Sequence, residues 1–93
     1  MNIAYKYDVK QGVTTAVDVI VDFAFPSRYL EIDVLFNAAT FQFQLQDGTY
    51  GGEIIYDPAT MAFPYIIPFK TAGFMVRSTD PVLPADYQLI SWF

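Results

Sequence analysis

The stretch that decides the fold is LEIDVLFNAATFQFQLQDGTYGGEIIY, Leu30 to Tyr56, in which apolar and polar residues alternate. Side chains of a β-strand point to opposite faces at every second residue, so each alternating run predicts a strand with one buried face and one polar face. The apolar members are Leu30, Ile32 and Val34 in the first run and Phe41, Phe43 and Leu45 in the second. We expect these two rows to pack against each other in one core.

Short connectors indicate how the strands of this stretch are joined. The connector Asn37–Ala39 is short, which predicts that the two runs pair antiparallel. Asp47-Gly48 tolerates the positive φ of a tight reversal, and Glu53–Tyr56 then returns the chain as a third strand.

The rest of the chain predicts further short strands. They are Ile3–Val9, which Gln11-Gly12 ends, then Val13–Phe25, Phe74–Arg77 and Tyr87–Phe93. Met61–Phe69 contains Pro64 and Pro68, which lack the N–H that a central strand donates, so we expect this segment at a sheet edge or in a covering loop. About eight strands with turns between them predict an all-β fold, a single antiparallel β-sandwich (jelly-roll or Ig-like) spanning residues 1–93.

Composition limits the possible classes of function. Hydrophobic residues make up 54% of the 93 residues and charged residues only 16%, against roughly 25% in typical soluble domains. So few charges cover a small domain poorly, which predicts that part of its apolar surface contacts another protein. The net charge is −5 with five scattered cations, so nucleic acid is not an expected partner. No signal peptide and no run near the ~20 residues of a spanning helix is evident, so no membrane partner is expected either.

No pattern of residues indicates catalysis or a cofactor. The chain has no His and no Cys, which removes the commonest general base and the commonest transition-metal ligands. Glu31 and Asp33 share one strand face about 6.6 Å apart, a spacing that suits a glycosidase pair but is also ordinary for a solvated strand face. Asp47, Glu53 and Asp57 offer oxygen ligands, yet the dense acidic loop of a calcium site is missing. We therefore expect a non-enzymatic protein that needs no metal or cofactor.

Aromatic residues keep a carbohydrate-binding or adhesion module as the alternative. Tyrosine and tryptophan provide flat faces on which sugar rings stack in β-sandwich binding modules. The candidates are Tyr5, Tyr7, Tyr29, Tyr50, Tyr56, Tyr65, Tyr87 and Trp92. The same residue types are frequent in strands and at protein interfaces, so composition does not separate these two functions.

Between Leu30 and Phe93 the predicted strands, turn and proline-rich segment follow one another in a particular order. They are the alternating strand ending near Asn37, the Gln-rich run, Asp47-Gly48, FPYIIPF at Phe63–Phe69, the strand Phe74–Arg77 and the closing Ile90-Ser91-Trp92. This order resembles the small β-sandwich structural proteins of tailed-phage virions, such as head decoration, cement and accessory head or tail proteins. The resemblance implies a protein located in the virion, in many copies, that stabilises a capsid or tail by contacts with its subunits and with copies of itself.

Phe63–Phe69 is the expected contact segment. Five of its seven residues are Phe, Tyr or Ile, which is more than solvent exposure of an edge explains. The expected interface residues are Phe63, Tyr65, Ile66, Ile67, Phe69 and Trp92. Tyr65 and Ile67 should point one way and Ile66 the other, so that one side serves the core and the other faces a partner. The alternative is that the whole segment plugs an open end of the sandwich.

Overall fold

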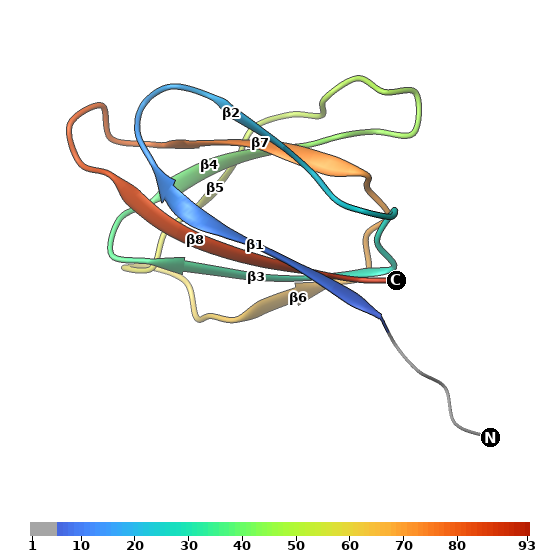
Figure 1. Ribbon diagram of the computed structural model, residues 1–93. Helices are drawn as coiled ribbons and strands as arrows, with labels where there is room; N and C mark the ends of the chain where they lie inside the picture. The colour runs from blue at the N-terminus through green and yellow to red at the C-terminus, as the bar shows by residue number, and fades with distance from the viewer. Residues whose placement is uncertain (1–5) are drawn as a thin grey trace.

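The computed structural model describes residues 6–93, which form two antiparallel four-stranded sheets packed face to face (Figure 1). Sheet A has the strand order β1-β8-β3-β6, and sheet B has the order β2-β7-β4-β5. The strands are β1 Tyr7–Thr14, β2 Val19–Asp22, β3 Tyr29–Leu35, β4 Ala39–Phe43, β5 Ile54–Tyr56, β6 Tyr65–Ile67, β7 Gly73–Ser78 and β8 Ala85–Trp92. The predicted all-β sandwich is confirmed. Within the described range, no helix is long and apolar enough to cross a membrane.

The core fills the space between the two sheets and is centred on aromatic rings. Its largest fully buried side chains are Phe41, Phe74, Leu30, Ile32, Leu89, Val34 and Val76. The Phe41 ring centroid lies 5.7 Å from that of Phe74 in sheet B and 6.2 Å from that of Tyr87 in sheet A. The contact with Tyr87 is edge-to-face, the geometry that the ring quadrupoles favour. The rings therefore join the two sheets directly.

The predicted pairing of the two central runs is wrong. β3 pairs with β8 and β6, while β4 pairs with β7 and β5, so the two runs face each other across the core. Both runs bury their apolar rows, because alternation decides which face turns inward but not which strand lies alongside. Leu45 is the exception, since it lies beyond the end of β4 and its side chain is 43% exposed.

The N-terminal strands also differ from the prediction. β1 continues through Gln11-Gly12, where the absence of a side chain makes room for Tyr87: a Cβ on Gly12 would lie 3.2 Å from the Tyr87 hydroxyl. The predicted single strand Val13–Phe25 is instead divided, because the chain turns after Thr14 and crosses to sheet B, where β2 begins at Val19. Of the predicted strand Ile3–Val9, residues 3–5 lie outside the described range.

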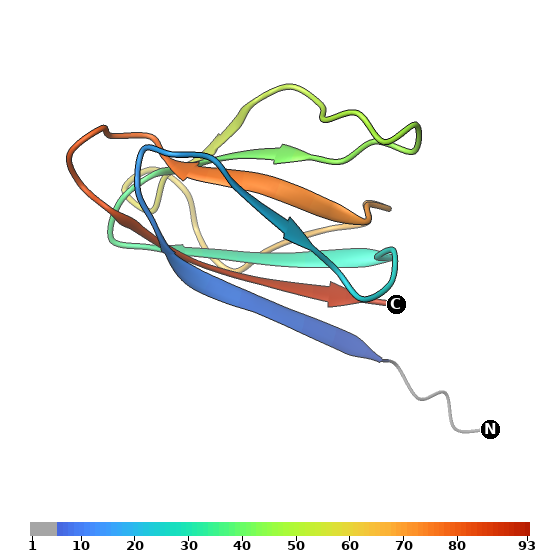
Figure 2. The same cartoon turned by 45° about the horizontal axis from the view of Figure 1, so that its top comes forward.

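The predictions that rest on turn chemistry and proline are confirmed. Gly48 has φ 90°, and the reversal that contains it leads from β4 to β5, which pair antiparallel. The Asp47 carboxylate stabilises this turn by accepting a hydrogen bond from the Thr49 N–H. β6, between its two prolines, lies at the edge of sheet A and pairs only with β3. Figure 2 shows the other edge of that sheet, where the blue strand β1 lies beside the red strand β8.

Removal of the central ring should be the most damaging truncation. Phe41→Ala is expected to lower the free energy of unfolding by about 3–5 kcal/mol, because the fully buried ring leaves a cavity between the sheets. The matched control is Phe36→Ala, which removes a ring that is 81% exposed and should change stability by less than about 0.5 kcal/mol. Urea denaturation followed by tryptophan fluorescence measures both. Equal effects of the two substitutions would contradict the central role of Phe41.

Two buried serines should respond oppositely to replacement by alanine. The Ser91 hydroxyl is fully buried and has no hydrogen-bond partner among residues 6–93, so Ser91→Ala should raise the free energy of unfolding by up to about 1 kcal/mol. Ser27 is also buried, but its hydroxyl donates to the Phe69 carbonyl (2.6 Å) and accepts from the Thr71 N–H (3.0 Å). Ser27→Ala should therefore lower stability by about 1–3 kcal/mol. Thermal unfolding monitored by circular dichroism measures both changes.

Candidate protein-docking surface

The outer face of sheet A gathers apolar side chains from all four of its strands. In the strand register Tyr7, Trp92 and Tyr29 form one row across β1, β8 and β3. The next row contains Val9, Ile90, Glu31 and Ile66. Residues in register on neighbouring strands share a face, so both rows point away from the core. We call the six uncharged members the apolar face: Tyr7, Val9, Tyr29, Ile66, Ile90 and Trp92.

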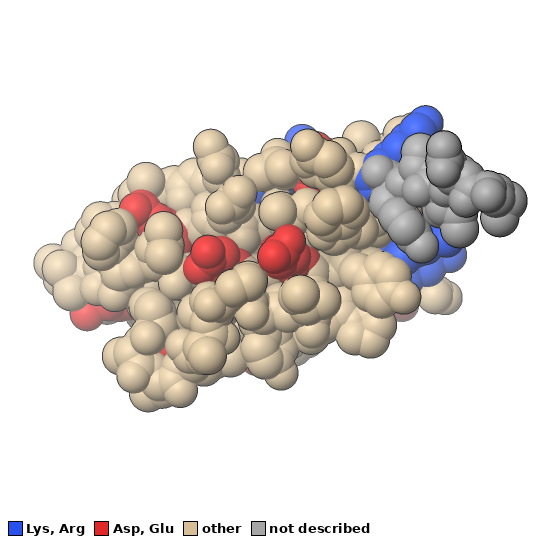
Figure 3. All heavy atoms as spheres, turned by 90° about the horizontal axis from the view of Figure 1, so that it is seen from below, with Lys and Arg blue, Asp and Glu red and all other residues tan. Residues whose placement is uncertain are grey.

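The exposed members of the apolar face are large. Tyr7 is 59% exposed, Tyr29 49% and Ile66 63%, while Trp92 is half-buried beneath its neighbours. The ring centroids of Tyr7 and Trp92 lie 5.1 Å apart, so the two aromatic side chains support each other across β1 and β8. Figure 3 views this side of the molecule and shows mostly uncharged atoms.

Two carboxylates lie within or beside the apolar face, and a third, Asp86, lies farther along the same side of sheet A in register with Val13 and Leu35. Glu31 stands in register with Ile90 and Ile66, and Asp33 with Gln88. Acidic groups are visible near the middle of the view in Figure 3, while basic groups gather toward one end. Neither Glu31 nor Asp33 forms a salt bridge within residues 6–93. The hollow beside them is only about 90 Å³, which is too small for a substrate-sized ligand.

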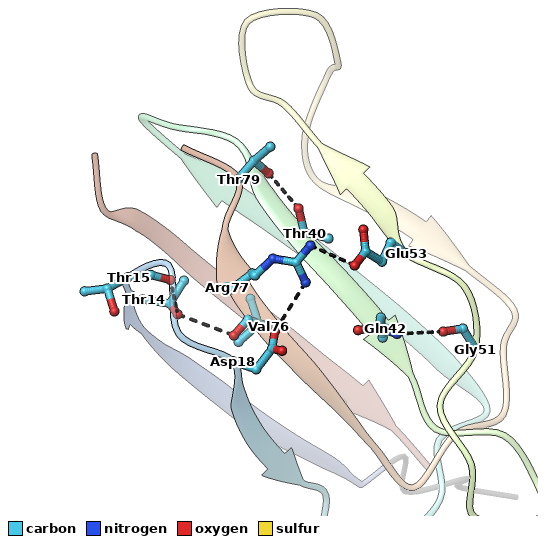
Figure 4. A network of polar contacts seen from close by, with 10 residues as sticks. All are labelled: Thr14, Thr15, Asp18, Thr40, Gln42, Gly51, Glu53, Val76, Arg77 and Thr79. Atoms are coloured by element: carbon cyan, nitrogen blue, oxygen red, sulfur yellow. Dashed lines mark hydrogen bonds and ion pairs between the residues drawn. The ribbon is translucent and has the colours of Figure 1, made fainter. Parts of the chain in front are cut away.

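The outer face of sheet B is different, because its polar groups are satisfied within the chain (Figure 4). Arg77 on β7 reaches both Asp18, at 3.3 Å, and Glu53, at 2.8 Å. The bond to the Glu53 carboxylate raises the pKa of the Arg77 guanidinium. Beside it the hydroxyls of Thr40 and Thr79 bond at 2.8 Å. This face therefore combines a closed polar network on β7 and β4 with one exposed isoleucine at each edge, Ile20 on β2 and Ile55 on β5.

The three carboxylates considered as calcium ligands do not converge. Glu53 pairs with Arg77. Asp47 accepts bonds from the Thr49 hydroxyl and N–H, which lower the pKa of its carboxyl group. Asp57 accepts a bond from the Ala59 N–H in the next turn. Among residues 6–93 no group of three or more acidic, His or Cys side chains is placed to hold a metal ion.

Most of the contact segment predicted from the sequence serves the core. Phe63, Ile67 and Phe69 pack against the buried cluster, and the ring of Tyr65 lies 6.0 Å from that of Tyr56. Ile66 points the other way and joins the apolar face, as the alternation predicts. Of the six predicted interface residues, the structure thus brings two, Ile66 and Trp92, to one outer surface.

The sugar-binding candidates divide in a similar way. Tyr7, Tyr29 and Trp92 form the aromatic row of the apolar face. Tyr56 and Tyr87 are buried in the core, where burial raises the pKa of each phenol, and Tyr65 packs beside Tyr56. Tyr50 is half-buried opposite Gln44, and Tyr5 lies outside the described residues. Sequence reasoning missed Val9 and Ile90 as members of this surface, although the alternation in β1 and β8 contains them.

A cleft at one end of the sandwich offers no chemistry. It measures about 410 Å³ and lies between the β2–β3 connection, the β4–β5 turn and the loop before β7. Its lining residues are Pro26, Gln44, Leu45, Gln46, Gly48, Lys70 and Ala72. Lys70 is the one ionisable group among them, so the cleft contains no acid–base pair and no activated nucleophile.

No protein-family model matches the chain, and no curated protein or solved structure matches it either. Function is therefore inferred from the chemistry of the surfaces described above. The apolar face is the candidate functional surface, because among residues 6–93 it combines clustered aromatic side chains with two carboxylates, Glu31 and Asp33, that form no salt bridge.

Proposed function

We propose that this protein is a non-enzymatic structural component of a larger protein assembly and that it docks through the apolar face. The observation that carries the proposal is the contrast between the two outer faces of the sandwich. In sheet B the closed polar network around Arg77 separates the two exposed isoleucines, Ile20 and Ile55, whereas sheet A presents Tyr7, Tyr29 and Ile66 in two neighbouring rows with no such network between them. Clusters of exposed aromatic and aliphatic side chains on small domains are typical of protein interfaces.

The charges within the apolar face indicate the chemistry of its partner. Glu31 lies between Ile90 and Ile66, so a partner that covers these isoleucines also covers the Glu31 carboxylate. Burial of an unpaired carboxylate is costly, which means that a stable complex needs a donor opposite it. We therefore expect an apolar partner surface that carries an Arg or Lys, or free backbone N–H groups, at its centre.

The assembly that we propose is the virion of a tailed phage. In this proposal the chain is a decoration, cement or accessory head or tail protein that binds capsid or tail subunits. The support is the resemblance of Leu30–Phe93 to such proteins, together with the small all-β fold and the docking face. A small β-sandwich that docks through its apolar face suits a protein that stabilises a shell by contacts with the shell subunits.

A carbohydrate-binding module is the second candidate, and the row Tyr7–Trp92–Tyr29 favours it. Two features of the row weigh against this function. The rings of Tyr7 and Trp92 are tilted by 43° and contact each other, so they do not form one flat platform. Val9 and Ile66 in the neighbouring row offer a sugar neither a stacking surface nor a hydrogen bond. Protein docking uses the aromatic and the aliphatic side chains together.

One substitution on the apolar face should block docking and leave folding intact. Ile66→Asp places a charge on an edge strand where the side chain is 63% exposed, so the free energy of unfolding should change by less than about 0.5 kcal/mol. The matched control is Ile55→Asp, at a 54% exposed position on the outer face of sheet B. Ile67→Asp should instead lose roughly 1–3 kcal/mol, because Ile67 packs against the core.

Docking is tested on virion particles. The gene is expressed together with the other genes of the genome that encodes it, and the particles are purified by density gradient. We expect the wild-type chain and Ile55→Asp to co-purify with the particles in many copies, and Ile66→Asp to remain in the soluble fraction. Particles that lack the wild-type chain would show that the virion proposal is wrong. A glycan array on which the wild-type chain binds and Trp92→Ala does not would favour the second candidate.

A further inference from the structure

Strand β1 forms an open edge of sheet A. β1 is eight residues long and pairs with β8 on one side only (Figure 2). It contains no proline and no bulge, since its register with β8 is continuous from Tyr7 to Thr14. A long, regular edge strand is a template for pairing with another chain unless the protein protects it.

The hydrogen bonds at the end of the ladder show which backbone groups face this edge. The Lys6 N–H donates to the Phe93 carbonyl, and the Phe93 N–H donates to the Lys6 carbonyl. In an antiparallel ladder such pairs recur at every second residue, so the even-numbered residues of β1 bond to β8. The N–H and C=O groups that point to the open edge belong to Tyr7, Val9, Gln11 and Val13. Within residues 6–93 no other backbone group bonds to them.

The other three edges are shorter or protected. β6 has three residues and lies between Pro64 and Pro68, which cannot donate to an added strand. β5 also has three residues, and β2 has four. Only β1 among the described edge strands offers four outward-facing residues in an unbroken strand.

We infer that β1 pairs antiparallel with β1 of a second copy of this chain, which joins the two A sheets into one continuous sheet. A two-fold axis at Lys10 aligns Tyr7 with Val13 of the second copy and Val9 with Gln11 of the second copy. All four outward-facing residues of each strand then find a partner, so the edge is complementary to itself. The alignment also sets an aromatic side chain against a β-branched one, a favourable cross-strand pair.

The charges of β1 agree with self-pairing. An inward-pointing lysine is one of the devices that block edge pairing, and Lys10 points to the inner side of sheet A. Here Lys10 lies 3.5 Å from the Asp8 carboxylate, which also accepts a hydrogen bond from the Ala24 N–H. The two-fold axis sets the two Lys10 side chains opposite each other, and the Asp8 carboxylate beside each lysine offsets their repulsion. Odd-numbered residues of β1 carry no charge at all.

Self-pairing would place the apolar faces of both copies on the same side of one joined sheet. Tyr7 and Val9 are members of the apolar face and also of the open edge, so the joined sheet presents one larger docking surface. The inference does not depend on the virion proposal, because it rests on the backbone geometry and side chains of β1. A docking partner and a second copy use different sides of β1.

The test uses the full 93-residue chain in size-exclusion chromatography with light scattering at about 200 µM, well above the micromolar range of weak interfaces. We expect the wild-type chain to be a dimer and Gln11→Pro to be a monomer, with dimerisation weakened at least tenfold. The proline removes an N–H that points to the open edge, so the ladder with β8 keeps its hydrogen bonds. Gln11→Thr retains the N–H and should remain a dimer. In the wild-type dimer, hydrogen exchange should be slow at the amides of Val9 and Gln11. In the Gln11→Pro monomer, which has no amide hydrogen at position 11, exchange at Val9 should be fast.

Two results would overturn the inference. One is a wild-type chain that stays monomeric with rapidly exchanging Val9 and Gln11 amides, and the other is a folded Gln11→Pro variant that remains a dimer.

If Gln11→Pro does not fold, Lys10→Cys decides the matter, since the natural chain has no cysteine. The two-fold axis places position 10 of one copy opposite position 10 of the second copy, at a Cα separation of about 4.5 Å, which is within disulfide range. Oxidation should link Lys10→Cys into dimers and leave Ala59→Cys unlinked, and equal behaviour of the two would refute self-pairing. Ile66→Asp should dimerise normally, which separates this test from that of docking.

Discussion

The contact of Phe41 with rings from both sheets is the interaction on which the rest of the structure depends. Phe74 lies beside it in sheet B, and Tyr87 meets its ring edge from sheet A. With 93 residues the chain has only one core, and without cysteine it has no disulfide to assist that core. The aromatic cluster and the aliphatic side chains packed around it therefore supply the burial that holds the two sheets together.

Two well-packed inner faces leave the outer faces free to differ. Short strands with strict alternation commit every second side chain to the core, and the remaining side chains determine what each sheet presents. In sheet B they include Thr40, Gln42 and Arg77, which bond within the chain and separate the exposed Ile20 from Ile55. In sheet A they include Tyr29 and Trp92.

The candidate surface draws on both ends of the described chain. Tyr7 near the beginning and Trp92 near the end become neighbours because β1 and β8 pair along their whole length, and β3 adds Tyr29 from the middle. The same pairing leaves β1 at the sheet margin, so the face that suits docking and the edge that suits self-association meet at one strand. In our proposals both surfaces would bind by burial and hydrogen bonding, as in a structural protein that assembles in many copies.

Local chemistry in the sequence determined which faces turn inward, where the chain reverses and which strand lies at an edge. The alternation around Leu30 and Phe41, the Asp47-Gly48 turn and the prolines beside β6 act through their own backbone geometry, so they can be read without knowledge of any neighbour. Only the tertiary structure decided that β3 pairs with β8 instead of β4 and that Tyr7 meets Trp92. An alternating strand fits several neighbours equally well, and the choice among them depends on how distant strands fill one shared core.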